Sequence, residues 1–211
     1  MNQITQILAL AIPILLALSI HELSHGLVAF HFGDPTAKNA GRLTLNPIAH
    51  LDPIGTLMLF IVHFGWAKPV PVNPAYFKDP KKDMLWVALA GPASNMVLAF
   101  LTGMIIRAVG MHMGSNFTFN FLKLMLYYSL TINLALAVFN LLPIPPLDGS
   151  KILQGLLPPK YDHIIYNLER YGPFILLGII MFGRISGFSI IGSIIWPFVN
   201  VFANLFAGIS I

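Results

Sequence analysis

Long apolar stretches alternate with shorter polar segments along the 211 residues of this chain. A helix needs about 20 mainly apolar residues to cross a bilayer. Three stretches reach that length and two more follow them: 4–30, 84–110, 119–142, about 172–183 and about 188–209. The fourth stretch is short and Gly172-Pro173 interrupts its approach, so it either begins earlier or is a half-span. The pattern predicts an all-α polytopic membrane protein.

The same pattern predicts a single domain over residues 1–211. Its core contains the three long spans and the segments that join them, about 4–155. The last two membrane segments follow at about 164–211 and flank this core. No internal repeat is present that would indicate an array of smaller units.

The segment between the first two spans, residues 31–83, is polar or mixed in character. It contains AGRLTLNP and WAKPVPVNP, whose prolines, asparagines and alternating apolar residues favour strands or turns over helix. Between them, DPIGTLMLFIVHFGW is apolar but short for a full crossing, so it either enters the membrane and returns or lies at the interface. Irregular backbone at that depth is tolerated only where it is buried in protein or lines a wet cavity. We therefore predict a membrane-associated, strand-rich or re-entrant loop.

Composition agrees with a membrane protein and excludes other classes. Hydrophobic residues make up 56% of the chain and charged residues 9%, and the mean hydropathy is +0.77; soluble domains carry about 25% charged residues. The net charge of +4 is not gathered in a basic run, which excludes a nucleic-acid partner. Cysteine is absent, which excludes disulfides, thiolate metal sites and a cysteine nucleophile.

Lysines and arginines predict the orientation in the membrane. Six lie in segment 31–83 and three in segment 143–171, whereas the opposite side has Arg107, Lys123 and Arg184. By the positive-inside rule, the two richer segments are cytoplasmic and the N-terminus faces outward. The first span lacks the basic region of a secretory signal peptide, so we expect it to be retained as a transmembrane helix.

The first span contains the pattern His21-Glu22-Leu23-Ser24-His25. In a helix His21 and His25 are one turn apart on the same face, so both imidazoles can reach one ion. Neutral imidazole binds zinc, and Glu22 can take a proton from metal-bound water. The alternative is a pair of histidines that only hydrogen-bond their neighbours. Ionisable side chains are costly in an apolar span, which favours the functional interpretation.

A catalytic zinc site needs a third protein ligand, and the candidate is Asp148. It ends the sequence FNLLPIPPLD after the third span, where three prolines must unwind the helix. Local sequence fits a helix N-cap equally well. Topology favours the ligand, because the first and third spans run in the same direction and bring both motifs to the cytoplasmic side. This requires segment 31–83 to leave and return on one side.

HELSH in the first span, GPASN at 91–95 and PPLDG at 145–149 resemble motifs of the site-2 protease family, the intramembrane zinc metalloproteases of peptidase family M50. The resemblance covers about residues 15–155. It is strongest to the compact prokaryotic members, which share GRLTLNP, HLDPIGT and WAKPVPVNP. Several relatives carry a PDZ or CBS domain or a span before the HExxH helix, and we expect none of these here.

The resemblance implies a three-helix transmembrane core with a membrane-associated, strand-rich loop after the first core helix. It implies one Zn²⁺ per chain held by His21, His25 and Asp148, with Glu22 as catalytic acid and base. The implied reaction is hydrolysis of peptide bonds in a membrane-embedded protein or peptide substrate. The implied location is a prokaryotic cell (inner) membrane, with the lipid bilayer as surroundings.

Four polar residues have two interpretations each. Asn95 either binds substrate backbone or an oxyanion, or makes a polar contact between helices. Asn140 is a candidate to bind substrate or to orient Asp148. His50 and His63 either approach the site or lie at the membrane interface, and we favour the interface.

Two other functions use the same residues. A metal-ion transporter or metal-binding membrane module also places His and Asp within the membrane, but usually repeats such ligands along a pathway. A catalytically silent relative would bind membrane segments without cutting them. The single cluster and the glutamate in the base position favour the protease.

Overall fold

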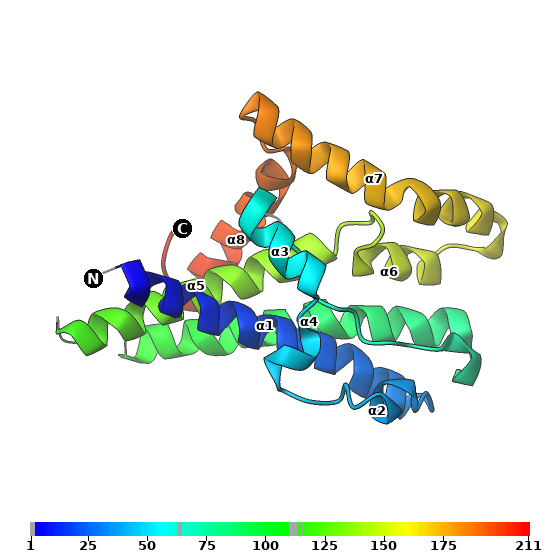
Figure 1. Ribbon diagram of the computed structural model, residues 1–211, viewed down its shortest axis with the longest axis horizontal. Helices are drawn as coiled ribbons and strands as arrows, with labels where there is room; N and C mark the ends of the chain where they lie inside the picture. Colours follow the sequence, from blue (N-terminus) through cyan, green and yellow to red (C-terminus); the bar gives the residue numbers. More distant parts are fainter. Residues whose placement is uncertain (1–2, 63–64, 110–113, 115) are drawn as a thin grey trace.

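The computed structural model describes residues 3–62, 65–109, 114 and 116–211. Its helices (Figure 1) are α1 (Gln3–His31), α2 (Thr36–Asn39), α3 (Pro53–Val62), α4 (Pro80–Val109), α5 (Phe117–Asn140), α6 (Asp148–Leu156), α7 (Asp162–Ser186) and α8 (Ile190–Ala207). Single 3-10 turns lie at Pro47–His50, Pro74–Tyr76 and Pro159–Tyr161.

Five of these helices are long and apolar enough to cross a bilayer: α1, α4, α5, α7 with the turn before it, and α8. They coincide with the five predicted stretches, which confirms the prediction of an all-α polytopic membrane protein. The fourth stretch does begin earlier than its apolar residues, because α7 starts at Asp162 and continues through Gly172-Pro173. An internal proline removes one backbone hydrogen bond, and membrane helices tolerate this loss.

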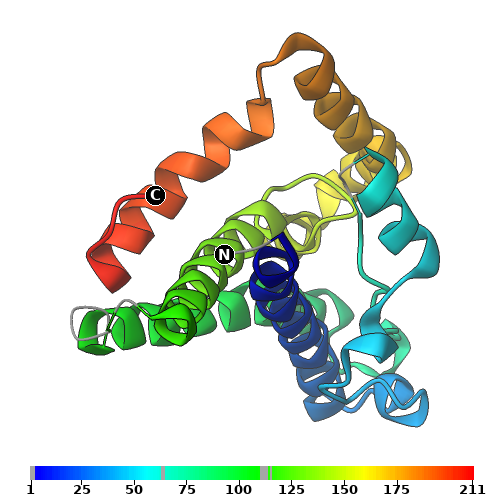
Figure 2. The ribbon, with the colours of Figure 1, turned by 60° about the vertical axis from the view of Figure 1, so that its left-hand side comes forward.

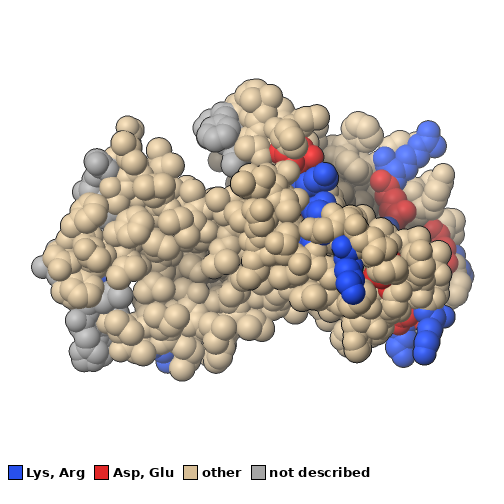
Figure 3. Space-filling model, turned by 60° about the horizontal axis from the view of Figure 1, so that its bottom comes forward, with Lys and Arg blue, Asp and Glu red and all other residues tan. Residues whose placement is uncertain are grey.

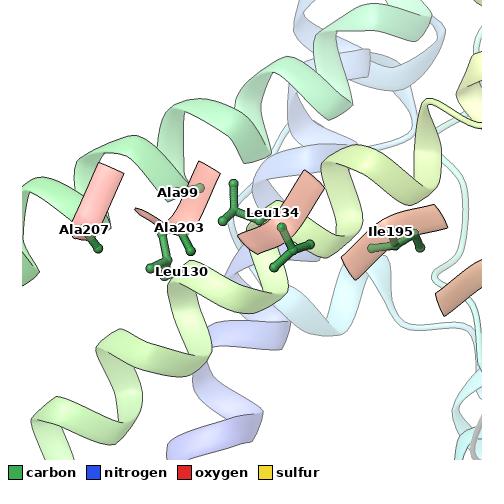
Figure 4. Close-up of a cluster of buried hydrophobic side chains, with 7 residues drawn as sticks. Ala99, Leu130, Leu134, Ile195, Ala203 and Ala207 are labelled. Carbon is green, nitrogen blue, oxygen red and sulfur yellow. The ribbon is translucent and has the colours of Figure 1, made fainter. Parts of the chain in front are cut away.

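Helices α1, α4 and α5 pack against one another, and α8 packs on α4 and α5 (Figures 1 and 2). A buried apolar cluster joins α4, α5 and α8 (Figure 4): Ala99, Leu130, Leu134, Ile195, Val199, Ala203 and Ala207. Alanines on α4 and α8 let these two backbones approach closely, which favours helix packing in a membrane. Helix α7 contacts α6 and α8 at the edge of this assembly.

Segment 31–83 does not form the predicted strands in the part of it that the structure describes. Its elements are α2, α3 and two 3-10 turns, and its only ladder contact is an isolated bridge between Leu51 and Ala67. The physical reason is the proline content: Pro69 and Pro71 have no backbone N–H to donate to a ladder. The strand-rich loop is thus not confirmed.

Helix α3 occupies the short apolar stretch inside that segment. At 10 residues it is too short to cross a bilayer. Asp52 caps it as a loop residue, because its Oδ1 accepts a hydrogen bond from the backbone N–H of Gly55 at 2.7 Å. The path of this helix relative to the membrane, re-entrant or interfacial, stays a prediction.

Charged side chains gather toward one end of the molecule (Figure 3). This end contains the C-terminus of α1, the start of α4, and α6 with the start of α7 (Figure 1). It therefore carries much of segments 31–83 and 143–171, which the sequence assigns to the cytoplasm, whereas α3 lies nearer the middle of the molecule (Figure 1). The distribution agrees with the predicted orientation, which remains a prediction.

Candidate metal centre

Helix α1 presents His21 and His25 on one face, one turn apart. Both side chains are buried, and their Nε2 atoms lie 3.0 Å from each other. The rings meet edge to face, with centroids 4.6 Å apart. The spacing that suggested a shared ion thus brings the two nitrogens together.

Asp148 reaches these histidines from α6, as its first helical residue. Its Oδ2 lies 3.1 Å from His21 Nε2 and its Oδ1 lies 3.3 Å from His25 Nε2. The N-cap position of α6 belongs to Leu147, and no side chain caps this helix. The N-cap alternative for Asp148 is therefore not the arrangement in the structure. These three side chains, hereafter the metal cluster, each offer one ligand atom within 4.8 Å of the others.

Helix α4 fixes the orientation of both imidazoles through their Nδ1 atoms. Nδ1 of His25 lies 2.7 Å from the carbonyl oxygen of Val87, and Nδ1 of His21 lies 2.6 Å from Asn95 Oδ1. A carbonyl oxygen can only accept, so His25 Nδ1 must carry the proton, and in the neutral imidazole this leaves the lone pair on His25 Nε2. The same assignment holds for His21 provided that Asn95 presents its oxygen.

Asn95 is held in that orientation by two further helices. Its Nδ2 donates to the carbonyl oxygen of Ala17 on α1 at 3.3 Å and to Asn133 Oδ1 on α5 at 2.9 Å. Asn133 in turn donates to the carbonyl oxygen of Ser129 at 2.8 Å. With its amino group committed twice, Asn95 has only Oδ1 left for His21. It is completely buried, which fits the orientation of His21 better than contact with substrate.

The metal cluster is therefore an arrangement of electron pairs that a cation would stabilise. With both imidazoles neutral, their Nε2 lone pairs face each other, and Asp148 Oδ2 is buried without a hydrogen-bond partner among the described residues. An unpaired buried oxygen is costly. A set of two histidines and one aspartate suits zinc, and three protein ligands leave a fourth position open, as in catalytic sites.

Gly91 on α4 keeps the space over the ligand atoms free. A Cβ built there would lie 2.6 Å from His21 Nε2 and also too close to His25 Nε2. Any other residue at this position would push into the cluster. The GPASN motif thus supplies both this open space and Asn95.

Glu22 lies beside the cluster on α1. Its Oε2 accepts a hydrogen bond of 2.7 Å from the backbone N–H of Val70. Asn140, in contrast, donates to the carbonyl oxygen of Leu136 on its own helix at 3.0 Å. His50 is buried and bonds to the carbonyl oxygen of Thr44 at 2.8 Å, inside its own segment. His63 lies outside the described residues.

Three groups at the site were not identified as functional from sequence: the carbonyl of Val87, the amide of Val70 and the side chain of Asn133. A backbone group leaves no signal in a sequence. Asn133 has a polar side chain in an apolar span, and this signal in the sequence indicates a role inside the bundle.

Asp34 anchors the chain just after α1. It is buried and accepts hydrogen bonds from the backbone N–H groups of Thr36 at 2.9 Å and Asn73 at 2.7 Å, and from the Thr36 hydroxyl. Burial alone would raise the pKa of Asp34, but these hydrogen bonds to Thr36 and Asn73 outweigh it and lower the pKa. The ionised side chain of Asp34 thus ties Asn73, near the end of segment 31–83, to the chain just after α1.

Comparison with known proteins agrees with this geometry. The model described as Peptidase family M50 matches residues 108–179, which include Asp148. The "Putative zinc metalloprotease YwhC" of Bacillus subtilis (strain 168) is 41% identical over 196 residues, which is 90% of this chain and 85% of the relative. The chain belongs to peptidase family M50.

More distant relatives of this M50 chain carry similar names. The "Putative zinc metalloprotease Rip2" of Mycolicibacterium smegmatis is 31% identical over 77% of this chain and 62% of the relative. The "Zinc metalloprotease MJ0392" of Methanocaldococcus jannaschii is 27% identical over 84% of this chain and 43% of the relative. No solved structure gives a significant match.

Proposed function

We propose that this M50 chain is an intramembrane zinc metalloprotease that hydrolyses peptide bonds of membrane-spanning proteins or peptides. The observation that carries the proposal is the metal cluster, in which two histidines with fixed Nδ1 protons and one aspartate bring three ligand atoms within 4.8 Å of one another. The names of the relatives add zinc and proteolysis to this geometry. One Zn²⁺ per chain would be held by His21, His25 and Asp148.

Zinc held there would supply a Lewis acid for the scissile carbonyl and a water of lowered pKa. Glu22 takes a proton from the attacking water while the water oxygen bonds to the carbonyl carbon of the substrate. Glu22 then gives this proton to the leaving nitrogen as the C–N bond breaks, so that one carboxylate is both base and acid. Oε2 of Glu22 is bound to Val70, which leaves Oε1 for the proton.

Asn95 and Asn140 have different parts in this proposal. Asn95 holds His21 in the tautomer that leaves Nε2 free. Asn140 lies at the end of α5, just before the loop that leads to Asp148, and stays a candidate to contact substrate or to orient that carboxylate.

The location of the cluster supports cleavage inside the bilayer, toward one face. His21 is ten residues from the end of α1, which is about 15 Å at the rise of an α-helix. That end carries most of the charged side chains (Figure 3). We propose a prokaryotic cell (inner) membrane, with the charged end in the cytoplasm and the N-terminus outside.

The transporter alternative gains no support. Among the described residues the metal cluster is one group on α1 and α6, without further sets of ligands along a path. The names of the relatives describe proteolysis rather than transport.

The test is to purify the full chain and measure zinc content and cleavage of a membrane-embedded substrate. Glu22→Gln should keep one zinc per chain and lose cleavage, because the carboxylate is the base and not a ligand. His25→Ala should lose both. Glu169→Gln, which changes the only other glutamate in the sequence, should keep both. Cleavage by Glu22→Gln would remove the assigned role, and a zinc-free active wild type would remove the proposed function.

A further inference from the structure

The catalytic glutamate is held from outside its own helix. Glu22 Oε2 accepts a hydrogen bond from the backbone N–H of Val70, a buried residue in segment 68–73, which has no regular secondary structure. A carboxylate with one fixed oxygen keeps the other in a defined direction. The position of this one backbone amide therefore decides where the proton-carrying oxygen of Glu22 points.

Few backbone hydrogen bonds hold segment 68–73 in place. Pro69 and Pro71 flank Val70 and have no N–H. The backbone amide of Lys68 donates to the carbonyl oxygen of His50 at 2.8 Å, and Asn73 is tied to Asp34. Neither bond fixes the rotation of the peptide group between Pro69 and Val70.

Arg42 supplies the missing contact. Its Nη2 donates to the carbonyl oxygen of Lys68 at 2.7 Å and its Nη1 to the carbonyl oxygen of Pro69 at 3.2 Å. In a trans peptide group the C=O and the N–H point to opposite sides. Holding the oxygen of Pro69 at Arg42 therefore directs the N–H of Val70 away from Arg42, toward Glu22. The peptide dipole lies with its negative end at the guanidinium and its positive end at the carboxylate.

Arg42 follows α2 by three residues, and the turn at the end of this helix positions it for the contact with Lys68 and Pro69. Gly41 has φ of +66°, a conformation that glycine adopts without strain. The N–H of Gly41 bonds to the carbonyl oxygen of Lys38 and the N–H of Arg42 to that of Ala37, the pattern of a Schellman motif. This turn directs the chain at Arg42 back toward segment 68–73.

Arg42 is costly to keep where it is. Its side chain is 7% exposed and its Nε is buried without a hydrogen-bond partner. The ion pairs found between described residues join other groups, so the guanidinium charge is met by carbonyl oxygens alone. A buried charge compensated only by carbonyl oxygens is costly to the fold, which favours a functional reason for its retention there.

We propose that Arg42 is a positioning residue, which fixes the Pro69–Val70 peptide group so that its N–H orients Glu22 for proton transfer. The inference rests on the proposed function of Glu22. The structural part of the inference, that Arg42 fixes the peptide group whose N–H belongs to Val70, does not depend on catalysis.

The experiment compares the full-length wild type with Arg42→Gln, Arg42→Lys and, as matched control, Lys38→Gln, which changes an exposed cation on α2. Amide hydrogen exchange is measured at Val70, whose proline neighbours carry no amide hydrogen. Zinc content is measured by elemental analysis, and kcat and KM on one membrane-embedded substrate.

Arg42→Gln should speed exchange at Val70 and lower kcat about tenfold or more, with KM and zinc content near wild type. Arg42→Lys should be intermediate, because an ammonium lacks the planar fork that spans two carbonyls. Lys38→Gln should match wild type in every measurement. If Arg42→Gln does not fold, Val70→Pro removes the same N–H with Arg42 in place and should lower kcat similarly.

Unchanged exchange at Val70 in Arg42→Gln would overturn the proposal, whatever happens to activity. Faster exchange with unchanged kcat would overturn its catalytic half, as would full kcat in Val70→Pro. If the wild type cleaves nothing, the proposed function fails, and the exchange measurement still decides whether Arg42 holds Val70.

Discussion

Up to Asn95, α4 meets α1 through hydrogen bonds, whereas beyond Asn95 it meets α8 mainly through apolar side chains, with Arg107 donating to two α8 carbonyls near the helix end. Between Val87 and Asn95, the carbonyl of Val87 and the side chain of Asn95 each hold one histidine. Beyond Asn95, Ala99 belongs to the apolar cluster shared with α5 and α8 (Figure 4). One helix therefore orients the metal cluster over part of its length and packs the bundle over the rest.

This difference shows how a membrane helix bundle can fix the orientation of polar side chains at a buried site. Hydrogen bonds are directional, so they fix ring rotation and tautomer, which packing alone does not. Close packing is tolerant of orientation but sensitive to volume. The two parts of α4 should therefore respond to mutation in different measurements.

Asn95→Ala should have the largest effect on the site. Without the Asn95 oxygen, His21 loses the partner that fixes its tautomer, and zinc affinity should fall about 10- to 100-fold. Competition with a chelator of known affinity measures this loss. Thr102→Val is the matched control, because it removes a hydroxyl contact of 3.1 Å to Ser129 elsewhere between α4 and α5. Equal zinc affinity in Asn95→Ala and wild type would contradict the role given to Asn95.

Leu134→Ala should separate packing from chemistry. Leu134 is completely buried in the apolar cluster, so its truncation leaves a cavity and should lower stability by about 2 kcal/mol or more. Thermal unfolding in detergent measures this change, while zinc bound per folded chain should stay the same. Leu205→Ala on α8, at an exposed position, should have little effect. A loss of zinc in folded Leu134→Ala would show that the two parts of α4 are not independent.

Asp34→Asn should have the smallest effect, a loss of stability that is present at neutral pH and shrinks at low pH. Its pKa is lowered in the folded chain, so its contribution to stability is complete above the unfolded pKa of about 3.9 and is lost as the pH falls through the folded value. Wild type should therefore lose stability below about pH 4 more steeply than Asp34→Asn. Unfolding temperatures between about pH 3 and pH 7 test this, and parallel curves would contradict it.

The sequence was most informative where chemistry and helical spacing coincide. His21 and His25 sit four residues apart in an apolar helix, which is enough to predict a shared face. Asp148 needed a second argument, because its local sequence also fits an N-cap; the parallel direction of α1 and α5 brought it into range. Sequence also located all five long helices, since twenty apolar residues leave few alternatives.

What the sequence could not supply were contacts made by backbone groups and contacts made at long range. Val87 holds His25 with a carbonyl that every residue possesses. Val70 binds Glu22 through an amide that is distinctive only because prolines stand on both sides. The strands predicted for segment 31–83 did not form in the described residues, because Pro69 and Pro71 remove ladder donors even where apolar residues alternate.

The division of the metal cluster between α1 and α6 has a thermodynamic consequence. Its ligands are 123 positions apart in sequence, from His25 to Asp148, so a bound ion acts as a cross-link that closes most of the chain into a loop. Such a link favours the folded state by mass action, more strongly as free zinc rises above its dissociation constant. Zinc supply would then govern how much of this protein survives in the membrane, as well as how fast it works.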